Sequence, residues 1–252
     1  MKNNLFNYAL HLADNSLILG HRLSEWTGHG PMLEQDIAIS NIALDLIGQA
    51  RNFYQYAATI KGNATTEDTL AYLRDAREFK NLLIAEVANG DWAQTILKLF
   101  FFSTYQFYLY QRLKESSDAQ LAAIAEKSLK EVTYHLRWSS EWVVRMGDGT
   151  DESHRRMETA LENLWPYTGE MFEASSDENV LFKNRVSVDV SEIKNDWQTK
   201  IDSIFEEATL SISPNENMWM HKGGKNGLHS EHLGFILAEM QFLQRAYPGC
   251  EW

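Results

Sequence analysis

The feature that most limits what this chain can fold into is the helical spacing of its apolar residues, which persists along nearly its whole length. Between residues 4 and 27, one helical stripe consists of Leu5, Ala9, Leu12, Ser16, Leu19, Leu23 and Trp26. Only 4 prolines and 14 glycines interrupt the 252 residues, too few for the turns of an all-β protein of this size. The sequence therefore predicts an all-α protein with long helices and few connections.

Capping residues and helix breakers divide this pattern into segments. Asp91 and Asp118 are placed to cap the helices that follow them. Pro166 lacks an N–H group and should break its helix near Trp165. Helices are predicted over residues 4–27, 32–59, 67–79, 91–115, 118–146, 152–172, 191–210 and 230–247.

Two segments differ from this pattern. Residues 32–59 are apolar on two neighbouring faces, which is typical of a central helix. Residues 185–190 alternate as a strand does, but they are too few and too isolated to make a sheet. Residues 174–190 are therefore predicted to be an extended connector.

Helices of roughly 24–29 residues measure about 36–43 Å at 1.5 Å per residue. Four or more such helices have the proportions of a ferritin-like long four-helix bundle with additional helices packed outside it. Since no repeat, linker or low-complexity tract divides the chain, a single domain over residues 1–252 is expected.

The net negative charge of the chain excludes some classes of binding partner. There are 23 Lys and Arg against 35 Asp and Glu, a net charge of −12, which opposes binding to nucleic acid and to anionic membrane surfaces. The acidic excess is concentrated in residues 151–196, where a solvated helix face is favoured over a docking patch. The single cysteine, Cys250, and a polar N-terminus favour a cytoplasmic protein. The apolar cluster of residues 97–102 is too short to span a membrane.

A ferritin-like bundle raises the question of a dimetal site, which is built from Glu residues and Glu-x-x-His motifs. None of the 8 histidines has a glutamate three positions before it. Asp151 and His154 have the right spacing, but they lie at a helix start, where Asp151 is better explained as a cap. The regular ligand pattern is therefore missing.

Carboxylate and histidine pairs with a looser spacing could still form an irregular dimetal site. Glu25 with His29, and Glu131 with His135, are each four residues apart, and Asp45 on the second helix could face them. For Glu131 and His135, a hydrogen-bonded pair in the core is favoured over metal ligation, because a dimetal site needs about four carboxylates and two histidines. Asp14, near His11 and Arg22, and the pair His232 and Glu239 have the same two interpretations.

A basic, glycine-rich loop covers residues 221–227 and leads into a helix N-terminus near Ser230. With Lys222 and Lys225, it has features that hold phosphate groups elsewhere. The loop matches neither the P-loop nor the dinucleotide fingerprint, so a mobile linker is the favoured interpretation. The sequence contains no nucleophile motif such as Gly-x-Ser-x-Gly, and Cys250 is a poor candidate for catalysis.

Three long blocks of this sequence resemble the PaaC subunits of ring 1,2-phenylacetyl-CoA epoxidases, and the likeness extends over nearly the whole chain. The blocks are ADNSLILGHRLSEWTGHGPMLEQDIAISNIALDLIGQAR from Ala13, LKEVTYHLRWSSEWVVRMGDGTDES from Leu129 and GGKNGLHSEHLGFILAEMQFLQR from Gly223. The resemblance implies a ferritin-like subunit of a bacterial oxygenase complex that epoxidises the ring of phenylacetyl-CoA in aerobic phenylacetate degradation. It further implies a di-iron centre in the related catalytic subunit (PaaA), a reductase supplied by NADPH, and no cofactor or catalytic residue in the PaaC subunit itself.

Two functions are therefore weighed. In the first, the chain is a non-catalytic structural subunit that supports the catalytic PaaA subunit and can associate with itself when alone. In the second, it is a self-sufficient dimetal-carboxylate oxidase or oxygenase that uses Glu131, His135, Asp45 and Glu25. The count of metal ligands favours the first. A contact of Lys222 and Lys225 with the phosphates of coenzyme A is a further expectation.

Overall fold

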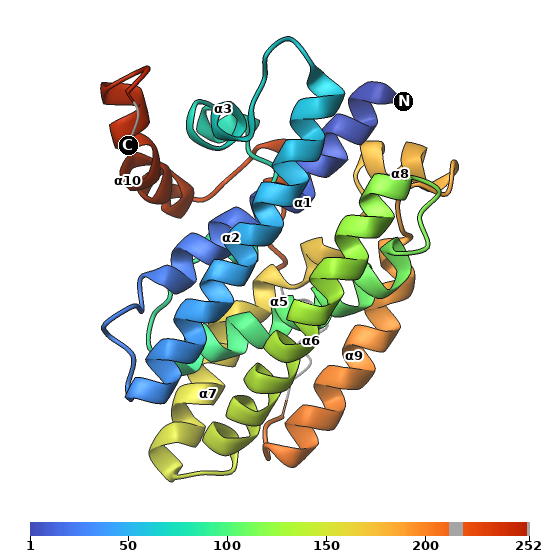
Figure 1. Ribbon diagram of the computed structural model, residues 1–252. Coiled ribbons are helices and arrows are strands. Elements are labelled where there is room, and N and C mark those ends of the chain that lie inside the picture. The colour runs from blue at the N-terminus through green and yellow to red at the C-terminus, as the bar shows by residue number, and fades with distance from the viewer. Residues whose placement is uncertain (212–218, 251–252) are drawn as a thin grey trace. The chain divides into compact units, whose positions relative to one another are not determined.

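A computed structural model describes residues 1–211 and 219–250, and within these residues every regular element is a helix (Figure 1). The chain divides into two compact units. One unit comprises Met1–Ala88 and the chain from Gly223 onward, and the other comprises Asn89–Lys222. Each unit has a pair of long helices at its centre.

In the first unit, α1 (Lys2–Ser24) packs along α2 (Leu33–Lys61). Gly20 allows the close approach, because a Cβ atom there would lie 3.1 Å from a side-chain carbon of Ile47. The other elements of this unit are shorter. They are α3 (Glu67–Tyr72), η1 (Ala76–Glu78), α4 (Leu83–Glu86), η4 (Gly224–Asn226) and α10 (Glu231–Ala246), which lies beside α3.

In the second unit, α5 (Trp92–Leu113) packs along α6 (Ala119–Gly147), with α7 (Asp151–Leu164) and α9 (Val190–Glu207) against them. The interior position of α5 follows from its sequence, which is apolar on all sides and includes the fully buried Phe100, Phe101 and Phe102. The indole N–H of Trp197 donates to the Phe101 carbonyl oxygen at 2.9 Å. The connecting elements are η2 (Trp165–Tyr167), η3 (Gly169–Phe172) and α8 (Ser176–Phe182).

The helix starts agree well with the capping signals in the sequence. Asp91 accepts a hydrogen bond from the Gln94 backbone N–H, and Asp118 accepts two from the first turn of α6, so both predicted caps are confirmed. Asp151 is not a cap: Thr150 caps α7 and Asp151 is the first helical residue. The break predicted at Pro166 is present, because α7 ends at Leu164.

Three further sequence predictions need correction. The helix predicted over 67–79 ends as α3 at Tyr72 and is followed by the separate turn η1. The predicted connector 174–190 contains α8. This helix begins at a capping box formed by Ser175 and Glu178. The helix predicted to be central, α2, exposes apolar side chains on one side, with Ile37 52% and Leu44 65% exposed, and α5 is the buried helix instead.

Within the described residues, no helix combines the length and the apolar character needed to cross a membrane. The expectation of one domain over residues 1–252 stays a prediction.

Candidate functional site

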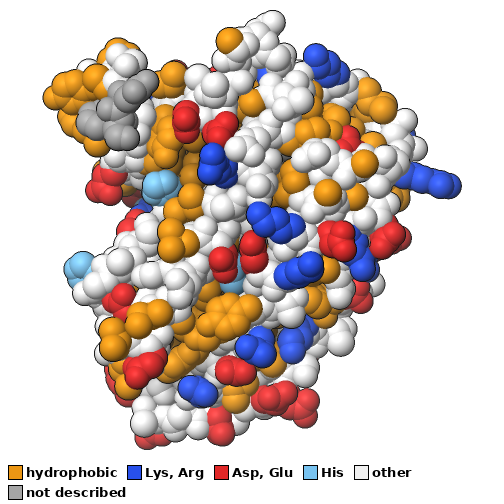
Figure 2. Space-filling view, in the orientation of Figure 1, with side chains coloured by type: hydrophobic (Ala, Val, Ile, Leu, Met, Phe, Trp, Pro, Cys, Tyr) orange, Lys and Arg blue, Asp and Glu red, His pale blue; other side chains and the backbone are white. Residues whose placement is uncertain are grey.

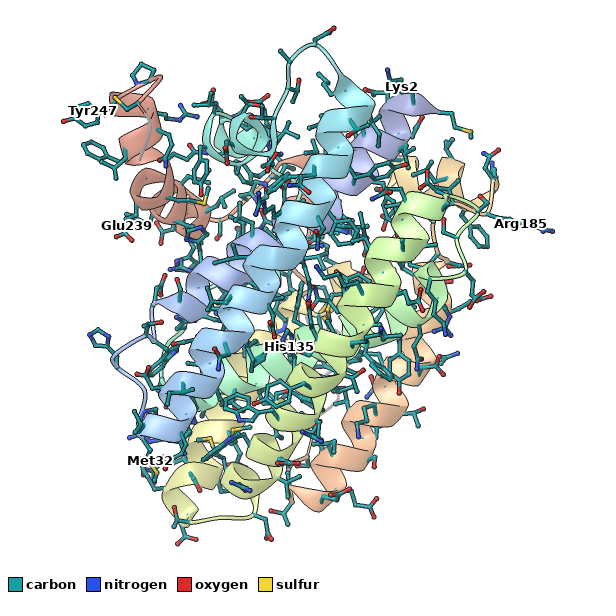
Figure 3. The ribbon with its side chains drawn as sticks, in the orientation of Figure 1. Lys2, Met32, His135, Arg185, Glu239 and Tyr247 are labelled. Atoms are coloured by element: carbon teal, nitrogen blue, oxygen red, sulfur yellow. The ribbon has the colours of Figure 1, made fainter. Side chains whose placement is uncertain are left out.

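The four residues named as possible metal ligands belong to both units. Glu25 and Asp45 lie in the first unit, on the C-cap of α1 and on α2, and Glu131 and His135 lie in the second unit, one turn apart on α6. Figure 3 labels His135 in the middle part of α6. Its side chain is completely buried, whereas Glu131 is partly buried. Glu25 is exposed and its carboxylate binds Arg22 at 2.7 Å.

The structure does not place these residues in a group of side chains that could ligate a metal ion. In residues 1–211 and 219–250, no group of three or more His, Cys, Asp or Glu side chains is arranged to hold a metal ion. His29 lies outside α1, is exposed, and places its ring against the carbonyl oxygen of Thr27, so Glu25 and His29 do not share a helix face. The ligand assignments for Glu131, His135, Asp45 and Glu25 stay predictions.

Two networks of buried polar groups lie inside the first unit. The first surrounds Asp14 on α1, whose side chain is completely buried. Arg74 donates to both of its oxygens, and the Tyr54 hydroxyl and the Lys80 backbone N–H donate at 2.5 and 2.8 Å. The network ties α1 to α2 and to the segment that follows α3.

The charges in this network are mutually dependent. Burial opposes the positive charge of Arg74, but the adjacent Asp14 carboxylate, Tyr54 and Glu78 raise the pKa of Arg74 above its ordinary value. Burial, together with the negative charge of Asp14, raises the pKa of Tyr54 well above its usual range, so this hydroxyl stays protonated and donates. Asp14 and Arg74 thus form a buried ion pair with hydrogen bonds on both carboxylate oxygens.

The second network surrounds Glu86, at the end of α4, which is also completely buried. Its carboxylate accepts from the Asn81 side-chain amide at 2.8 Å, from the His229 ring at 2.8 Å and from the Ser230 backbone N–H at 2.6 Å. Since Ser230 is the N-cap of α10, Glu86 fixes the start of the C-terminal helix.

His229 is placed so that both ring nitrogens face oxygen acceptors. Nδ1 lies 2.8 Å from the Glu86 carboxylate and Nε2 lies 2.9 Å from the Phe79 carbonyl oxygen. A carboxylate and a carbonyl can only accept, so both bonds form only when the ring is a doubly protonated imidazolium. Burial opposes this charge, but the hydrogen bond and the charge of Glu86, with the Phe79 carbonyl, raise the pKa of His229.

Both networks act as structural elements, and their carboxylates do not suit a metal ion. The oxygens of Asp14 and Glu86 are already engaged by Arg74, His229 and N–H donors. A cation at either carboxylate would have to displace Arg74 or His229, because both carry positive charge close to it. The dimetal site that ferritin-like proteins build from such inward carboxylates therefore does not fit these residues.

Sequence reasoning points to Asp14 as an inward carboxylate but not to Arg74, Glu86 or His229. One signal could have found Glu86: it is the lone charge in the apolar run Leu82–Val87, and a charge in such a run is buried and needs a partner. The partners themselves lie 60 residues from Asp14 and 143 residues from Glu86, so no local pattern indicates them.

The glycine-rich loop is packed against backbone. A Cβ atom on Gly224 would lie 2.1 Å from the Asn81 carbonyl oxygen, and Gly227 has a φ of +78°. Lys222 is exposed, belongs to the second unit and pairs with Glu173 at 3.5 Å, whereas Lys225 is buried and belongs to the first unit. The glycines therefore allow close backbone packing, and a coenzyme A contact of the two lysines stays a prediction.

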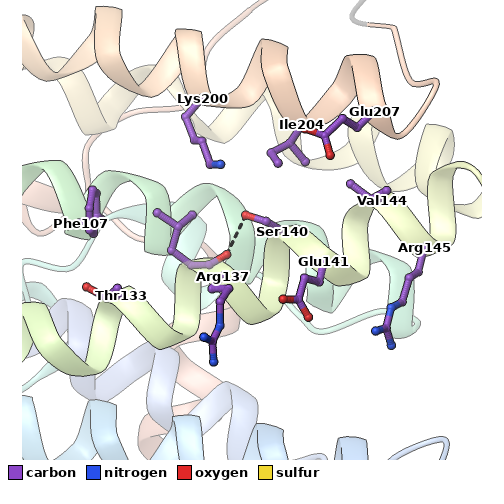
Figure 4. A pocket seen from close by; sticks show the side chains of 11 residues that line it. Phe107, Thr133, Arg137, Ser140, Glu141, Val144, Arg145, Lys200, Ile204 and Glu207 are labelled. Atoms are coloured by element: carbon purple, nitrogen blue, oxygen red, sulfur yellow. Dashed lines mark hydrogen bonds between the residues drawn. The ribbon is translucent and has the colours of Figure 1, made fainter.

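A groove of about 480 Å³ lies in the second unit between α6 and α9 (Figure 4). Its apolar part includes Leu136 and Ile204, and the Lys200 side chain extends from α9 toward α6. The Ser140 hydroxyl donates to the Leu136 carbonyl oxygen at 2.7 Å, so it is engaged by its own helix. The lining contains no His, Cys or Asp, and this groove carries no arrangement of a nucleophile and a base.

Comparison with known proteins gives consistent results over the full chain. The family model described as phenylacetic acid catabolic protein matches residues 1–252. The C subunit of 1,2-phenylacetyl-CoA epoxidase from Escherichia coli (strain K12) is 48% identical over 250 residues, which cover 99% of this chain and 100% of that protein. The resemblance seen in the sequence blocks and the prediction of an all-α, ferritin-like fold are both confirmed. The chain belongs to the family of phenylacetic acid catabolic proteins.

Proposed function

We propose that this chain is the PaaC subunit of a 1,2-phenylacetyl-CoA epoxidase in phenylacetate catabolism, and that it serves the complex as a structural, non-catalytic subunit. The observation that carries the proposal is the 48% identity with the Escherichia coli protein along the entire length of both chains. An identity of this extent, without long insertions or missing segments, supports the same place in the same kind of complex.

The buried charges support the non-catalytic part. The inward carboxylates of the first unit bind Arg74 and His229 rather than presenting open oxygens, and a di-iron or dimanganese centre needs several open carboxylates at one point. In this proposal the di-iron centre belongs to the catalytic PaaA subunit, and electrons come from NADPH through a reductase subunit. The complex is cytoplasmic, and this chain holds the catalytic subunit in its active arrangement.

The experiment that tests this role removes the possible metal ligands while keeping the complex intact. A double variant, Asp45→Asn with Glu131→Gln, keeps the size of both side chains and is combined with the catalytic subunit and the reductase. Oxygen- and NADPH-dependent turnover of phenylacetyl-CoA should stay within about twofold of the wild-type complex. Leaving this chain out should abolish turnover, since the catalytic subunit then lacks its support.

A dimetal enzyme in this chain would give the opposite pattern. Turnover of the double variant would fall by about a hundredfold or more, as expected when ligands of a catalytic metal are lost. Wild-type turnover by this chain and the reductase without the PaaA subunit would also contradict the proposal.

A further inference from the structure

The groove between α6 and α9 in the second unit has the size of a site for a small molecule. Its volume of about 480 Å³ falls within the range of ligand pockets, which is about 300–1,000 Å³. Leu136 of α6 and Ile204 of α9 line it and are buried, and Phe107 of α5 lines it and is half-buried. The groove therefore presents apolar side chains from three helices to a ligand.

The charges of the lining differ from those of the whole chain. Three basic and two acidic side chains line the groove, whereas the chain has 23 Lys and Arg against 35 Asp and Glu. Several Lys and Arg side chains lie over α6 on the face shown in Figure 2. Glu141 lies one helical turn from both Arg137 and Arg145, and these two arginine side chains extend away from α9 (Figure 4). The remaining cation of the lining is Lys200 on α9.

The ammonium group of Lys200 is placed to bind an anion. Its side chain is half-buried and extends from α9 toward α6 (Figure 4). The acidic residue one turn before it on α9, Asp196, already binds Arg112 at 2.6 Å. Within residues 1–211 and 219–250, Lys200 forms no ion pair with a carboxylate. An anion in the groove therefore gains a charge-assisted hydrogen bond in partly desolvated surroundings.

The rest of the lining offers few hydrogen-bond donors to a ligand. The lining residues of α6 and α9 lie within those helices, so their backbone N–H groups bond along the helix. The hydroxyls of Thr133 and Ser140 each donate to a carbonyl oxygen of their own helix at 2.7 Å. A phosphate group is bound by several donors, as at a helix N-terminus, whereas one ammonium group matches one carboxylate. The lining thus fits a ligand with a single carboxylate.

The two ends of the groove differ in charge. Among the lining residues of α9, Lys200 comes first and Glu207, the last residue of the helix, comes seven positions later. The end of α6 lies beside this end of α9, since the Thr209 hydroxyl donates to the carbonyl oxygen of Gly147 at 3.4 Å. Helix C-termini carry partial negative charge, so an anion is disfavoured there and favoured at Lys200. The seven residues rise by about 10 Å, and an extended octanoate has a similar length.

We propose that this groove is a binding site for an amphipathic monocarboxylate, whose carboxylate pairs with Lys200 and whose apolar body lies along Leu136 and Ile204 toward Glu207. Alkyl and aryl carboxylates share this chemistry. All the residues of the site belong to the second unit, and binding needs no partner chain. The inference therefore goes beyond the proposed function and does not depend on it.

Isothermal titration calorimetry of the full-length chain with octanoate tests the site. Octanol and octylamine have the same chain with a neutral and a cationic head group. Octanoate should bind at least about tenfold more tightly than either, because a charge-assisted hydrogen bond contributes roughly that factor. Phenylacetate identifies the body of the ligand: tighter binding than octanoate assigns the site to aryl carboxylates, and weaker binding assigns it to alkyl carboxylates.

Two variants locate the ligand in the groove. Lys200→Met removes the charge and keeps the length of the side chain, so it should weaken octanoate binding at least about tenfold and leave octanol binding within about twofold. Val144→Trp fills the groove and should weaken the binding of both. The matched control is Lys194→Met, which changes an exposed lysine of α9 outside the lining and should alter neither affinity. Circular dichroism and thermal unfolding verify that the variants are folded.

Three results would overturn this inference. The first is that neither octanoate nor phenylacetate binds the wild-type chain at millimolar concentration. The second is that Lys200→Met and Lys194→Met bind octanoate equally well, which would mean that Lys200 does not hold the carboxylate. The third is tighter binding of octylamine than of octanoate, which would assign a cation to the end of the groove at Glu207. Since none of these measurements involves the catalytic subunit, each of these results leaves the proposed function standing.

Discussion

At the scale of single residues, the molecule depends on two buried charge pairs, Asp14 with Arg74 and Glu86 with His229. Their partners come from separate stretches of the chain, so each pair fixes how those stretches pack. A buried pair of this kind contributes less by its attraction than it costs when one partner is lost, because the remaining charge is then buried alone.

Asp14→Asn tests the first pair. Asparagine keeps the size of the side chain but leaves the Arg74 charge uncompensated, so the free energy of unfolding should fall by about 3–5 kcal/mol. The matched control is Arg51→Ala, which removes an exposed ion pair with Glu67, whose carboxylate oxygen lies 3.4 Å from Nε of Arg51. This control should lower the free energy of unfolding by less than about 1 kcal/mol. Urea unfolding measures both. Equal, small losses would show that the Asp14 network adds little to stability.

The second pair predicts a pH dependence. Because the folded-state pKa of His229 is raised, the stability from its charge is complete below its unfolded value of about 6.5. It is lost as the pH rises through the folded-state pKa. Burial lowers the pKa of His21 against the opposing effect of Glu25, so the contribution of His21 has the opposite sign and is lost on acidification.

His229→Gln separates the two effects, because His21 is unchanged in the variant. The difference in free energy of unfolding between the wild type and His229→Gln should be about 1–3 kcal/mol near pH 6 and should shrink toward higher pH. Urea unfolding across this range measures it. A difference that does not change with pH would mean that His229 is neutral in the folded protein.

The single sequence could not identify these pairs as units. The lone glutamate in an apolar run and the histidine beside a glycine-rich loop are visible separately, but nothing local connects Glu86 with His229. His11, which the sequence places near Asp14, binds the Lys80 carbonyl oxygen and the Asn15 amide, and neither bond is indicated by the sequence. The identity of a buried partner is a property of the fold.

At the scale of elements, helical periodicity predicts the long helices well, because each buries a continuous apolar stripe. Asp91 and Asp118 are recognisable as caps because their side chains satisfy backbone N–H groups directly after them. The short helix α8 is not predicted, because the alternation of residues 185–190 outweighs the capping box of Ser175 and Glu178 in a reading based on periodicity. Short helices depend on such caps more than on periodicity.

Two glycine-to-alanine substitutions should change the stability of the protein in opposite directions. Gly224→Ala places a Cβ atom 2.1 Å from the Asn81 carbonyl oxygen, so the loop must move and stability should fall by about 1–3 kcal/mol. Gly48→Ala on α2 meets nothing within 4 Å and should raise stability by about 0.5–1 kcal/mol, since alanine is the better helix former. Thermal unfolding of the two variants measures both shifts. Equal shifts for the two variants would show that loop packing at Gly224 is unimportant.

At the scale of the whole molecule, the all-α, ferritin-like fold and the family were both predictable from the sequence. The fold follows from the length and periodicity of the helices, and the family from long ordered blocks that resemble PaaC subunits, in agreement with the relative at 48% identity. The exposed side of α2 was not predictable, because an apolar stripe on a helix indicates burial without indicating which molecule covers it. The wide apolar surface of residues 32–59 predicts a central helix, because such a surface indicates burial. In the structure this surface is partly uncovered, and Leu44 is 65% exposed.

The proposed function requires this chain to support a catalytic partner and to hold no metal centre of its own. The most direct test is the iron and manganese content of the purified chain, produced alone in metal-supplemented medium and measured by plasma mass spectrometry. A structural subunit predicts well under about one metal ion per chain. A value near two per chain, the content of a ferritin-like dimetal site, would contradict this function and make Glu131 and His135 the first residues to change.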